Sequence, residues 1–280
     1  MTSFQRIIKY VAIAFAIYLC LMIIGIILTT ITAIFGISIG FGIFEDRNTA
    51  MVTKWEQEYS NITSMDIDLS VCRLNIKKGN TLKVDVSNVS DEFKCQVEGS
   101  KLEIKDRKVQ SNFFNREDIT PQVTIYVPEQ QEFREVSIET GINETNIEFL
   151  KADTIKLEMG AGKYQMEELF ANYAEIKVGA GETNIQNSKI EELKLEGGIG
   201  KLSLTSEITK TADIDCGVGK VEMNLIGDLT DYKIKASTGL GSFKVDGKKV
   251  TDNETIGEGD TMIKMDAGVG ETIVQFVKGL

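Results

Sequence analysis

The chain has 280 residues, of which 31 are basic and 42 acidic, and its formal net charge at pH 7 is −11. It contains no histidine, which excludes the commonest general base, Ser–His and Cys–His nucleophile systems, and histidine-containing metal sites. The acidic balance argues against binding to nucleic acid or to anionic lipid head groups.

An uncharged stretch over residues 10–44 predicts a membrane anchor. A spanning helix needs about 20 apolar residues, so this stretch suffices for one span and is barely long enough for two. The simplest interpretation is one span near residues 10–30, followed by a glycine-rich apolar extension. The stretch is much longer than the core of a signal peptide, so we expect the anchor to be retained.

The charges around this stretch predict its orientation. Arg6 and Lys9 precede it, whereas acidic residues 45–46 follow it. The positive-inside rule therefore places residues 1–9 in the cytoplasm and the C-terminal domain outside the cell membrane. Only two of the 31 basic residues and none of the 42 acidic ones precede residue 45, so the rest of the chain carries a net charge of −13.

The next residues predict a linker and the start of a β domain. Residues 45–60 are interpreted as a juxtamembrane linker, in which Trp55 and Tyr59 either anchor at the lipid interface or close the near end of the β domain. Alternating apolar residues within 61–135 predict strands at irregular spacing, for example from Ile67 to Ile76. Because terminal repeats are usually atypical, we interpret residues 61–135 as an N-terminal cap.

Residues 136–280 are dominated by a Gly-x-Gly motif. Successive copies begin 19, 19, 19, 22 and 29 residues apart and occupy residues 160–162, 179–181, 198–200, 217–219, 239–241 and 268–270. A degenerate copy at residues 141–143 lies 19 residues upstream of the first. Self-similarity at a short fixed period is typical of a stacked-repeat architecture.

The spacing of apolar residues around the motif predicts strands. With the first glycine as position 0, apolar or small side chains fall at −5, −3, −1, +1, +4 and +6, as from Ile155 to Met166. Spacing by two indicates strand alternation, and the phase slips by one between +1 and +4. We therefore expect the residue at +1 to face inward and the glycine at +2 to form a corner with positive φ. The predicted fold is all-β: a parallel β-solenoid of ~19-residue repeats, of undetermined handedness, preceded by one transmembrane α-helix.

Outward positions alternate in charge from one repeat to the next. The alternating columns are Lys156, Glu175, Lys194, Asp213 and Lys235 at −4; Glu158, Lys177 and Glu196 at −2; and Glu144, Lys163, Glu182 and Lys201 at +3. Neighbouring rungs of a sheet lie about 4.8 Å apart, so each charge would have an opposite neighbour above and below. Exposed pairs contribute about 0.2–1 kcal/mol each, so these columns are expected to set the register.

The cysteines do not predict a metal site or a disulfide framework. Cys20 lies in the span, while Cys95 and Cys216 occupy inward positions and are predicted to be core residues. Cys72 occupies an outward position and is the thiol expected to react.

No residues predict catalysis. The pairs Asp66/Asp68 and Asp213/Asp215 each place two carboxylates on one strand face, but the second pair occupies two charge columns, which favours a solvated ladder. Each glycine motif leads into a strand, whereas a phosphate-binding loop must open a helix. We therefore predict a non-enzyme without catalytic, cofactor-binding or metal-binding residues.

Two C-terminal segments depart from the repeat. Residues 246–261 form the longest irregular insertion and are interpreted as a surface hairpin in preference to a recognition loop. The strand at 273–277 has apolar residues on both faces and is either covered by a cap or is a free pairing edge.

Several segments together resemble a known family. The residues that carry the resemblance are RIIKYVAIAFAI at 6–17, LNIKKGNTLKV at 74–84, VTIYVP at 123–128, and the repeated strand–Gly-x-Gly–strand units. This combination resembles the bacterial putative-adhesin domain family of β-strand-repeat membrane proteins, which includes LiaG. The resemblance implies an extracytoplasmic β-solenoid on a single span, and it supplies neither catalytic residues nor a ligand. Some family members sit beside envelope-stress signalling systems.

The expected function is that of a non-enzymatic, membrane-anchored surface-binding module or adhesin. The alternative is an accessory of a cell-envelope stress response that acts through protein–protein contact. A carbohydrate-active β-helix enzyme would need clustered carboxylates outside the charge columns, and we find none. Expected partners are the membrane, an unidentified protein or cell-wall glycan, and a second copy joined through the span or the C-terminal edge strand.

Overall fold

The computed structural model describes residues 54–106 and 120–278. The predicted cytoplasmic segment, span and apolar extension, residues 1–44, lie outside these ranges. Within them, no helix has the length and apolar character needed to cross a bilayer. The described residues belong to one compact unit. They form strands almost throughout and include a short 3-10 turn, η3 (Leu229–Asp231).

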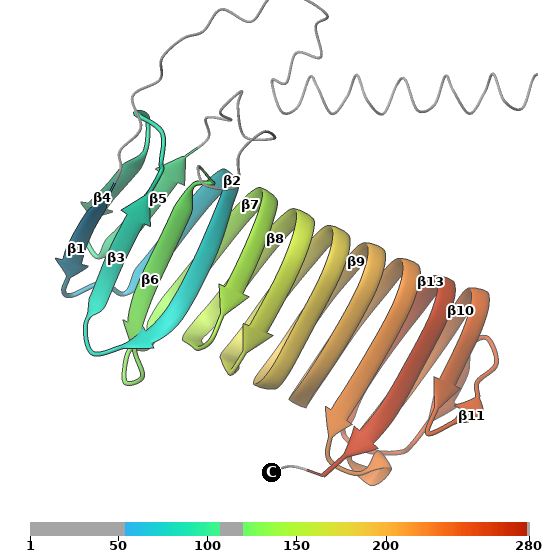
Figure 1. Ribbon diagram of the computed structural model, residues 1–280. Helices are drawn as coiled ribbons and strands as arrows, with labels where there is room; N and C mark the ends of the chain where they lie inside the picture. The colour runs from blue at the N-terminus through green and yellow to red at the C-terminus, as the bar shows by residue number, and fades with distance from the viewer. Residues whose placement is uncertain (1–53, 107–119, 279–280) are drawn as a thin grey trace, which may run out of the picture. The chain divides into compact units, whose positions relative to one another are not determined.

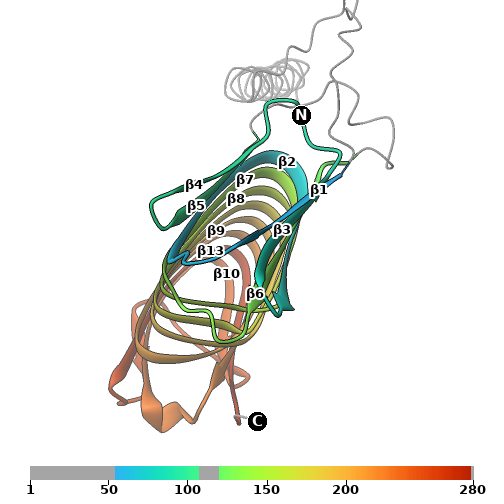
Figure 2. The same ribbon diagram turned by 90° about the vertical axis from the view of Figure 1, so that its left-hand side faces the viewer.

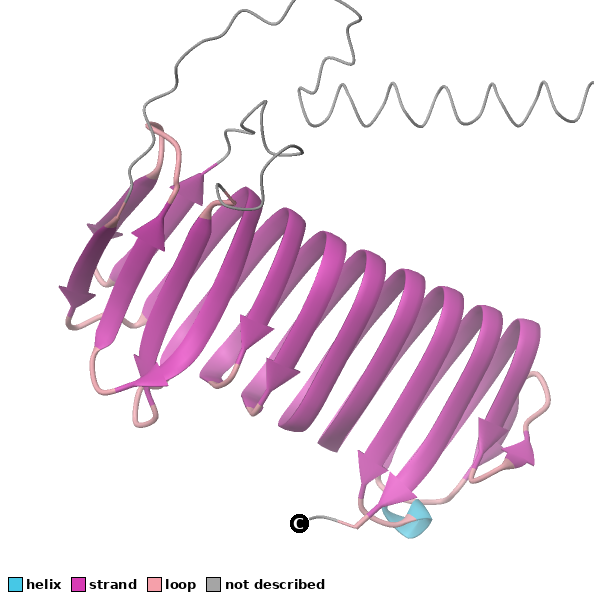
Figure 3. Ribbon diagram, viewed as in Figure 1, coloured by secondary structure: helices cyan, strands magenta, loops and turns pink. Residues whose placement is uncertain are grey.

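The strands form one continuous stack of rungs (Figure 1). In chain order they are β1 (Trp55–Tyr59), β2 (Ser64–Gly79), β3 (Leu82–Ser87), β4 (Lys94–Glu98), β5 (Lys101–Asp106), β6 (Gln122–Pro128), β7 (Phe133–Ile147), β8 (Leu150–Glu167), β9 (Leu169–Ile226), β10 (Tyr232–Val245), β11 (Lys248–Lys249), β12 (Glu254–Ile256) and β13 (Thr261–Val277). Because β9 spans three glycine motifs, it winds through three rungs without interruption, as the secondary-structure colouring shows (Figure 3).

The rungs are parallel and in register, as the 19-residue period predicts. Ile142 of β7 lies opposite Ala161 of β8, which in turn lies opposite Ala180 of β9. Each rung bends once along its length, and the view along the stack shows the bends nested within one another (Figure 2). The predicted all-β stack of parallel repeats is therefore confirmed for the described part of the chain.

The interior of the bend differs from the prediction at two positions. Side chains at −5, −3, +4 and +6 face inward as expected, and Leu195 at −3 is fully buried. The residue at +1 faces outward instead: Ile199 is 65% exposed. Asn143 and Cys72, which occupy position +2 in the rungs without a second glycine, are buried. The phase therefore slips between −1 and +2, so that positions 0 and +1 form the outer corner.

Close stacking explains the glycines at this corner. A Cβ on Gly198 would lie 1.8 Å from the carbonyl oxygen of Gly179 on the preceding rung, and one on Gly200 would lie 1.9 Å from that of Gly181. Gly200 also has a φ of +142°, in the region that L side chains rarely adopt, as we expect for position +2. Both glycines are therefore required by the neighbouring rung, while the residue between them is free to vary.

The rungs at the two ends are not stacked in chain order. At the C-terminal end β13 lies between β9 and β10, so motif 268–270 is inserted between 217–219 and 239–241. At the other end, β2 lies between β7 and the rung formed by β5 and β6. Neither expectation for residues 273–277, a strand covered by a cap or a pairing edge, is met, because β13 lies between two rungs and pairs with β10 through Val274 and with β9 through Val277.

Short antiparallel strands cover both ends of the stack. Within the insertion 246–261, β11 and β12 each pair with the outer edge of β10, so this segment covers an edge. At the other end residues 55–59, predicted to lie in the linker, form β1 and pair with β3. The Trp55 ring packs edge-on against Phe93 at 6.4 Å between centroids, so this aromatic residue closes the near end of the β domain.

Candidate interaction surface

The thiol expected to react is buried. Cys72 occupies position +2, which faces inward, and it is 4% exposed. Its Sγ accepts a hydrogen bond from Asn143 Nδ2 at 3.2 Å. Burial raises the pKa of the Cys72 thiol to about 12, so it is held in the unreactive protonated form. Cys216 is buried as predicted, and Cys95 is half-buried with its Sγ 3.0 Å from the Tyr59 hydroxyl.

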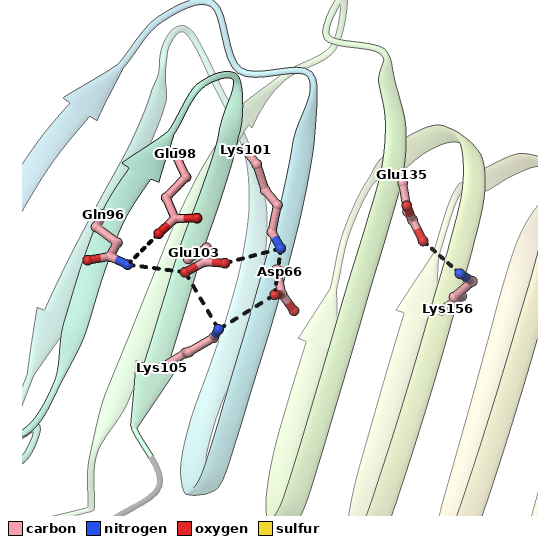
Figure 4. Close-up of polar contacts among 8 residues, drawn as sticks. All are labelled: Asp66, Gln96, Glu98, Lys101, Glu103, Lys105, Glu135 and Lys156. Carbon is pink, nitrogen blue, oxygen red and sulfur yellow. Dashed lines mark hydrogen bonds and ion pairs between the residues drawn. The ribbon is translucent and has the colours of Figure 1, made fainter.

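Of the first acidic pair, Asp66 lies in an ion-pair network with Glu103 that the sequence did not reveal, whereas Asp68 is buried outside this network (Figure 4). Asp66 faces Glu103 of the neighbouring strand β5. Lys101 Nζ bridges the two carboxylates at 3.0 and 3.1 Å, and Lys105 Nζ does so at 3.8 and 3.5 Å. Hydrogen bonds from Lys101 and from Gln96 hold the pKa of Glu103 below its usual range. Two lysines thus neutralise two ionised carboxylates, an arrangement that holds strands together and leaves no carboxyl poised for proton transfer.

The second acidic pair also belongs to the charge columns. Asp213 lies 3.3 Å from Lys264, and Asp215 lies opposite Asp266 on the next rung. In residues 54–106 and 120–278 no three metal-ligating side chains come together. Neither predicted acidic pair therefore builds a site of its own.

Of the cross-rung pairs that the alternation of the charge columns predicts within the described residues, only Glu175–Lys194 forms. Lys194 reaches Glu175 at 3.3 Å, as the alternation predicts. At −2, however, Lys177 turns to Glu175 of its own rung, and Glu196 to Lys194 of its own rung. Consequently the predicted pairs Glu158–Lys177 and Lys163–Glu182 do not form. Within the described residues four of these side chains take part in no ion pair: Glu158, Lys163, Glu182 and Lys235, the last of which lies opposite Lys264.

Exposed aliphatic side chains gather along the outer corner. We define the corner ridge as the residues at +1 of successive rungs, which in spatial order are Ile142, Ala161, Ala180, Ile199, Val218, Val269 and Leu240. Five of the eight exposed large apolar side chains of the described residues belong to it, with exposures of 39, 65, 49, 46 and 76% for Ile142, Ile199, Val218, Val269 and Leu240. Contiguous exposed apolar patches of this kind mark interaction sites.

A small hollow lies beneath the C-terminal half of the ridge. Its volume is about 40 Å³, and Thr183, Leu202, Val221 and Thr272 line it together with corner glycines. The hollow exists because glycine at +2 contributes no inward side chain, whereas Asn143 fills the equivalent space near the other end. It is far smaller than the several hundred Å³ of typical small-molecule sites, so the ridge itself is the stronger candidate surface.

Solved structures and a family model show similarity to the chain. The chain is similar to the solved structure of a putative cell adhesion protein from Clostridium sporogenes, with 17% identity, coverage of 80% of this chain and 99% of that chain, and a TM-score of 0.33. A putative adhesin from Bacteroides fragilis has 13% identity, with coverage of 84% of this chain and 100% of that chain and a TM-score of 0.41. A putative lipid binding protein from Parabacteroides distasonis has 15% identity, with coverage of 84% of this chain and 99% of that chain and a TM-score of 0.36.

No curated protein matches the chain. The family model for Toastrack DUF4097 matches residues 62–264, nearly the whole of the β stack. The repeated strand–Gly-x-Gly–strand units, on which the resemblance to a β-strand-repeat family depends, lie largely within this match. The chain belongs to the Toastrack DUF4097 family.

Proposed function

We propose that this protein is a non-enzymatic, membrane-anchored binding module whose β stack is presented outside the cell. The observation that carries the proposal is the register: from β2 to β10, each residue lies opposite the equivalent residue of the next rung. Equivalent outward positions therefore recur about every 4.8 Å along one surface, which suits an extended partner with its own repeat.

The polar columns at −4 and +5 are the surfaces on which such a partner would lie. Position −4 alternates between lysine and carboxylate groups from Lys156 to Lys264. Position +5 carries amides in four neighbouring rungs, from Asn75 to Asn184, and Asn184 Nδ2 donates to Gln165 Oε1 at 3.0 Å. A column of amides offers donors and acceptors at a fixed spacing. An extended glycan or peptide strand could pair with these groups along several rungs without any rearrangement of the backbone.

The ion pairs of one acidic cluster fit a non-enzymatic role. The carboxylates closest to a catalytic pair, Asp66 and Glu103, are both bridged by Lys101 and Lys105. Carboxylates that two lysines bridge in this way serve as structural ion pairs.

An accessory role in an envelope-stress response is the second candidate. The corner ridge favours it, because an exposed line of aliphatic side chains suits a protein partner better than a polar glycan. In that case the binding surface would be the ridge, and the polar columns would serve only to hold the register.

A pull-down with the full-length protein distinguishes the two functions. The bait is incubated with isolated cell wall and, separately, with solubilised membrane proteins of the same organism. Saturable, salt-tolerant retention on the wall supports the binding module, and Gln165→Ala with Asn184→Ala should weaken it. Wall binding that survives replacement of the outward columns contradicts the proposed surface. Recovery of one membrane protein without wall binding favours the accessory role.

A further inference from the structure

Unpaired charges flank the corner ridge on both sides. Position −2 precedes the ridge and position +3 follows it, so the two columns lie on opposite sides of the line of aliphatic side chains. Glu158, Lys163 and Glu182 belong to these columns and take part in no ion pair within the described part of the chain. Unpaired ionised groups around an apolar strip resemble the polar rim of an interface.

The two flanking columns are complementary to each other within each rung. In four consecutive rungs, position −2 and position +3 carry opposite charges: Glu158 and Lys163, Lys177 and Glu182, Glu196 and Lys201, and Asp215 and Lys220. The sign at each position changes between the first and second of these rungs and again between the second and third. A partner that matches this pattern must carry the same alternation in the same order.

We propose that the corner ridge is the seam of a parallel homodimer of this chain. A twofold axis along the stack would place each rung opposite the same rung of the second copy. The residue at −2 of one copy then faces the residue at +3 of the other, on both sides of the seam, because a twofold interface uses the same patch twice. These four rungs would form oppositely charged pairs in this arrangement, whereas the two adjoining rungs would set Glu139 against Glu144 and Asp266 against Glu271.

An antiparallel arrangement fits the charges poorly. In the same four rungs it would bring position −2 of one copy against position −2 of the other, so that Glu158 meets Asp215 and, in the +3 column, Lys163 meets Lys220. Juxtaposed like charges disfavour association. The charge pattern therefore selects the parallel arrangement, in which both β1 strands lie at the same end of the dimer.

The shape of the ridge also suits contact with its own copy. Each ridge residue lies on the seam and meets the same residue of the partner. The corner glycines on either side of it carry no side chain that would hold the two copies apart. Burial of Ile199, Val218, Val269 and Leu240 would supply the apolar part of the interface. This dimer uses neither the polar columns at −4 and +5 nor any enzymatic group, so it stands independently of the proposed binding function.

Charge reversal and rescue in the full-length protein test the proposal. Sedimentation in density-matched detergent should show a reversible dimer, which Ile199→Ser with Leu240→Ser should dissociate. Glu158→Lys places a lysine against Lys163 of the partner subunit on both sides of the seam and should weaken association about tenfold or more. The double variant Glu158→Lys with Lys163→Glu should restore the dimer. Because neither residue has an intrachain ion pair, rescue cannot be explained within one chain.

Cysteine cross-linking tests the direction of the two copies. In a Cys20→Ser background, Ala161→Cys, Val218→Cys and Leu240→Cys should each form disulfide-linked dimers under mild oxidation, because each position meets itself. Lys189→Cys, exposed and away from the ridge, should not. Cross-linking at only one ridge position would indicate an antiparallel contact and overturn the proposal. A monomer at all concentrations, association unchanged in the ridge variants, or a different protein bound to the ridge would also overturn it.

Discussion

The corner glycines and the residue between them have different neighbours. The missing Cβ of Gly198 points at the Gly179 carbonyl of the preceding rung, only 1.8 Å away. Gly197, one residue earlier, would place a Cβ no closer than 3.7 Å to any atom outside its chain neighbours. Two adjacent glycines thus have opposite tolerance for a methyl group, although the sequence alone does not separate them.

We expect Gly198→Ala to destabilise the protein by about 2 kcal/mol or more, because the methyl group can be accommodated only if two rungs move apart. Gly197→Ala should be neutral or stabilising by about 0.4–1 kcal/mol, because it reduces the entropy of the unfolded chain without strain. Urea denaturation of both variants measures the difference. Similar midpoints for the two would contradict the close stacking at position 0.

The outward direction of the ridge gives a second prediction at this scale. Leu195→Asp places a carboxylate in the fully buried interior and should prevent folding. Ile199→Asp, four residues later at a 65% exposed site, should change the free energy of unfolding by about 0.5 kcal/mol or less. Thermal unfolding followed by circular dichroism compares them, and equal losses would mean that position +1 faces inward after all.

The sequence predicts the buried positions of the repeat but not the direction of +1. Apolar residues at −3 and +4 require one phase slip between them, and two placements of that slip fit equally well. Glycine at +2 has no side chain whose polarity would indicate where the slip occurs. An aliphatic residue at +1 is therefore predicted to be a core residue. Asn143, polar yet buried at +2, is exceptional, and the same ambiguity placed Cys72 on the wrong face.

At the scale of whole strands, the insertion of β13 between β9 and β10 is the main departure from chain order. Charged contacts fit this order: Lys264 lies 3.3 Å from Asp213, and Glu271 lies 3.0 Å from Lys244. The repeat could not predict it, because the same residue types face each other whichever rung comes next. The long interval of 29 residues between the last two motifs is the sequence feature that indicates a longer connection. Through this connection the chain passes along the outer edge of β10 and returns to place β13 between β9 and β10.

Engineered disulfides test the order of these strands. Cα atoms of adjacent rungs lie about 4.8 Å apart, within the range that a disulfide spans, whereas rungs two apart lie beyond it. Asp213→Cys with Lys264→Cys should therefore cross-link under mild oxidation, as judged by peptide mapping. Asp213→Cys with Lys235→Cys should not, because β13 separates them. The reverse result would place β10 directly on β9.

The network between β2 and β5 predicts a pH dependence. The folded-state pKa of Glu103 is lowered, chiefly by the hydrogen bond from Lys101, so this group's stabilisation is complete above its unfolded pKa of about 4.3. It is lost as the pH falls through the lower folded value. Between pH 5 and 3 the wild type should lose stability more steeply than Glu103→Gln in urea titrations. Parallel pH profiles would show that the network does not stabilise the ionised form.

At each end of the stack, short antiparallel strands pair with the outer edge of a longer strand. At the far end β11 and β12 cover β10, and at the near end β1 covers β3. An uncovered edge of a long parallel stack would be a template for pairing with another chain. The end caps are therefore part of what keeps a repetitive sequence from continuing into a second molecule. The short repeat period and the capped ends together produce one domain of finite length. This domain lies within the compact unit of residues 49–280.

Two truncations test whether the domain begins with β1. A chain starting at Thr49 keeps the cap, whereas one starting at Asn61 loses the packing of Trp55 on Phe93 and the contact between Tyr59 and Cys95. Losing two half-buried aromatic side chains should lower the free energy of unfolding by about 2 kcal/mol. It should also expose the edge of β3, so light scattering should detect association of the shorter chain with time. If the two chains were equally stable and equally soluble, residues 55–59 would belong to the linker and not to the β domain.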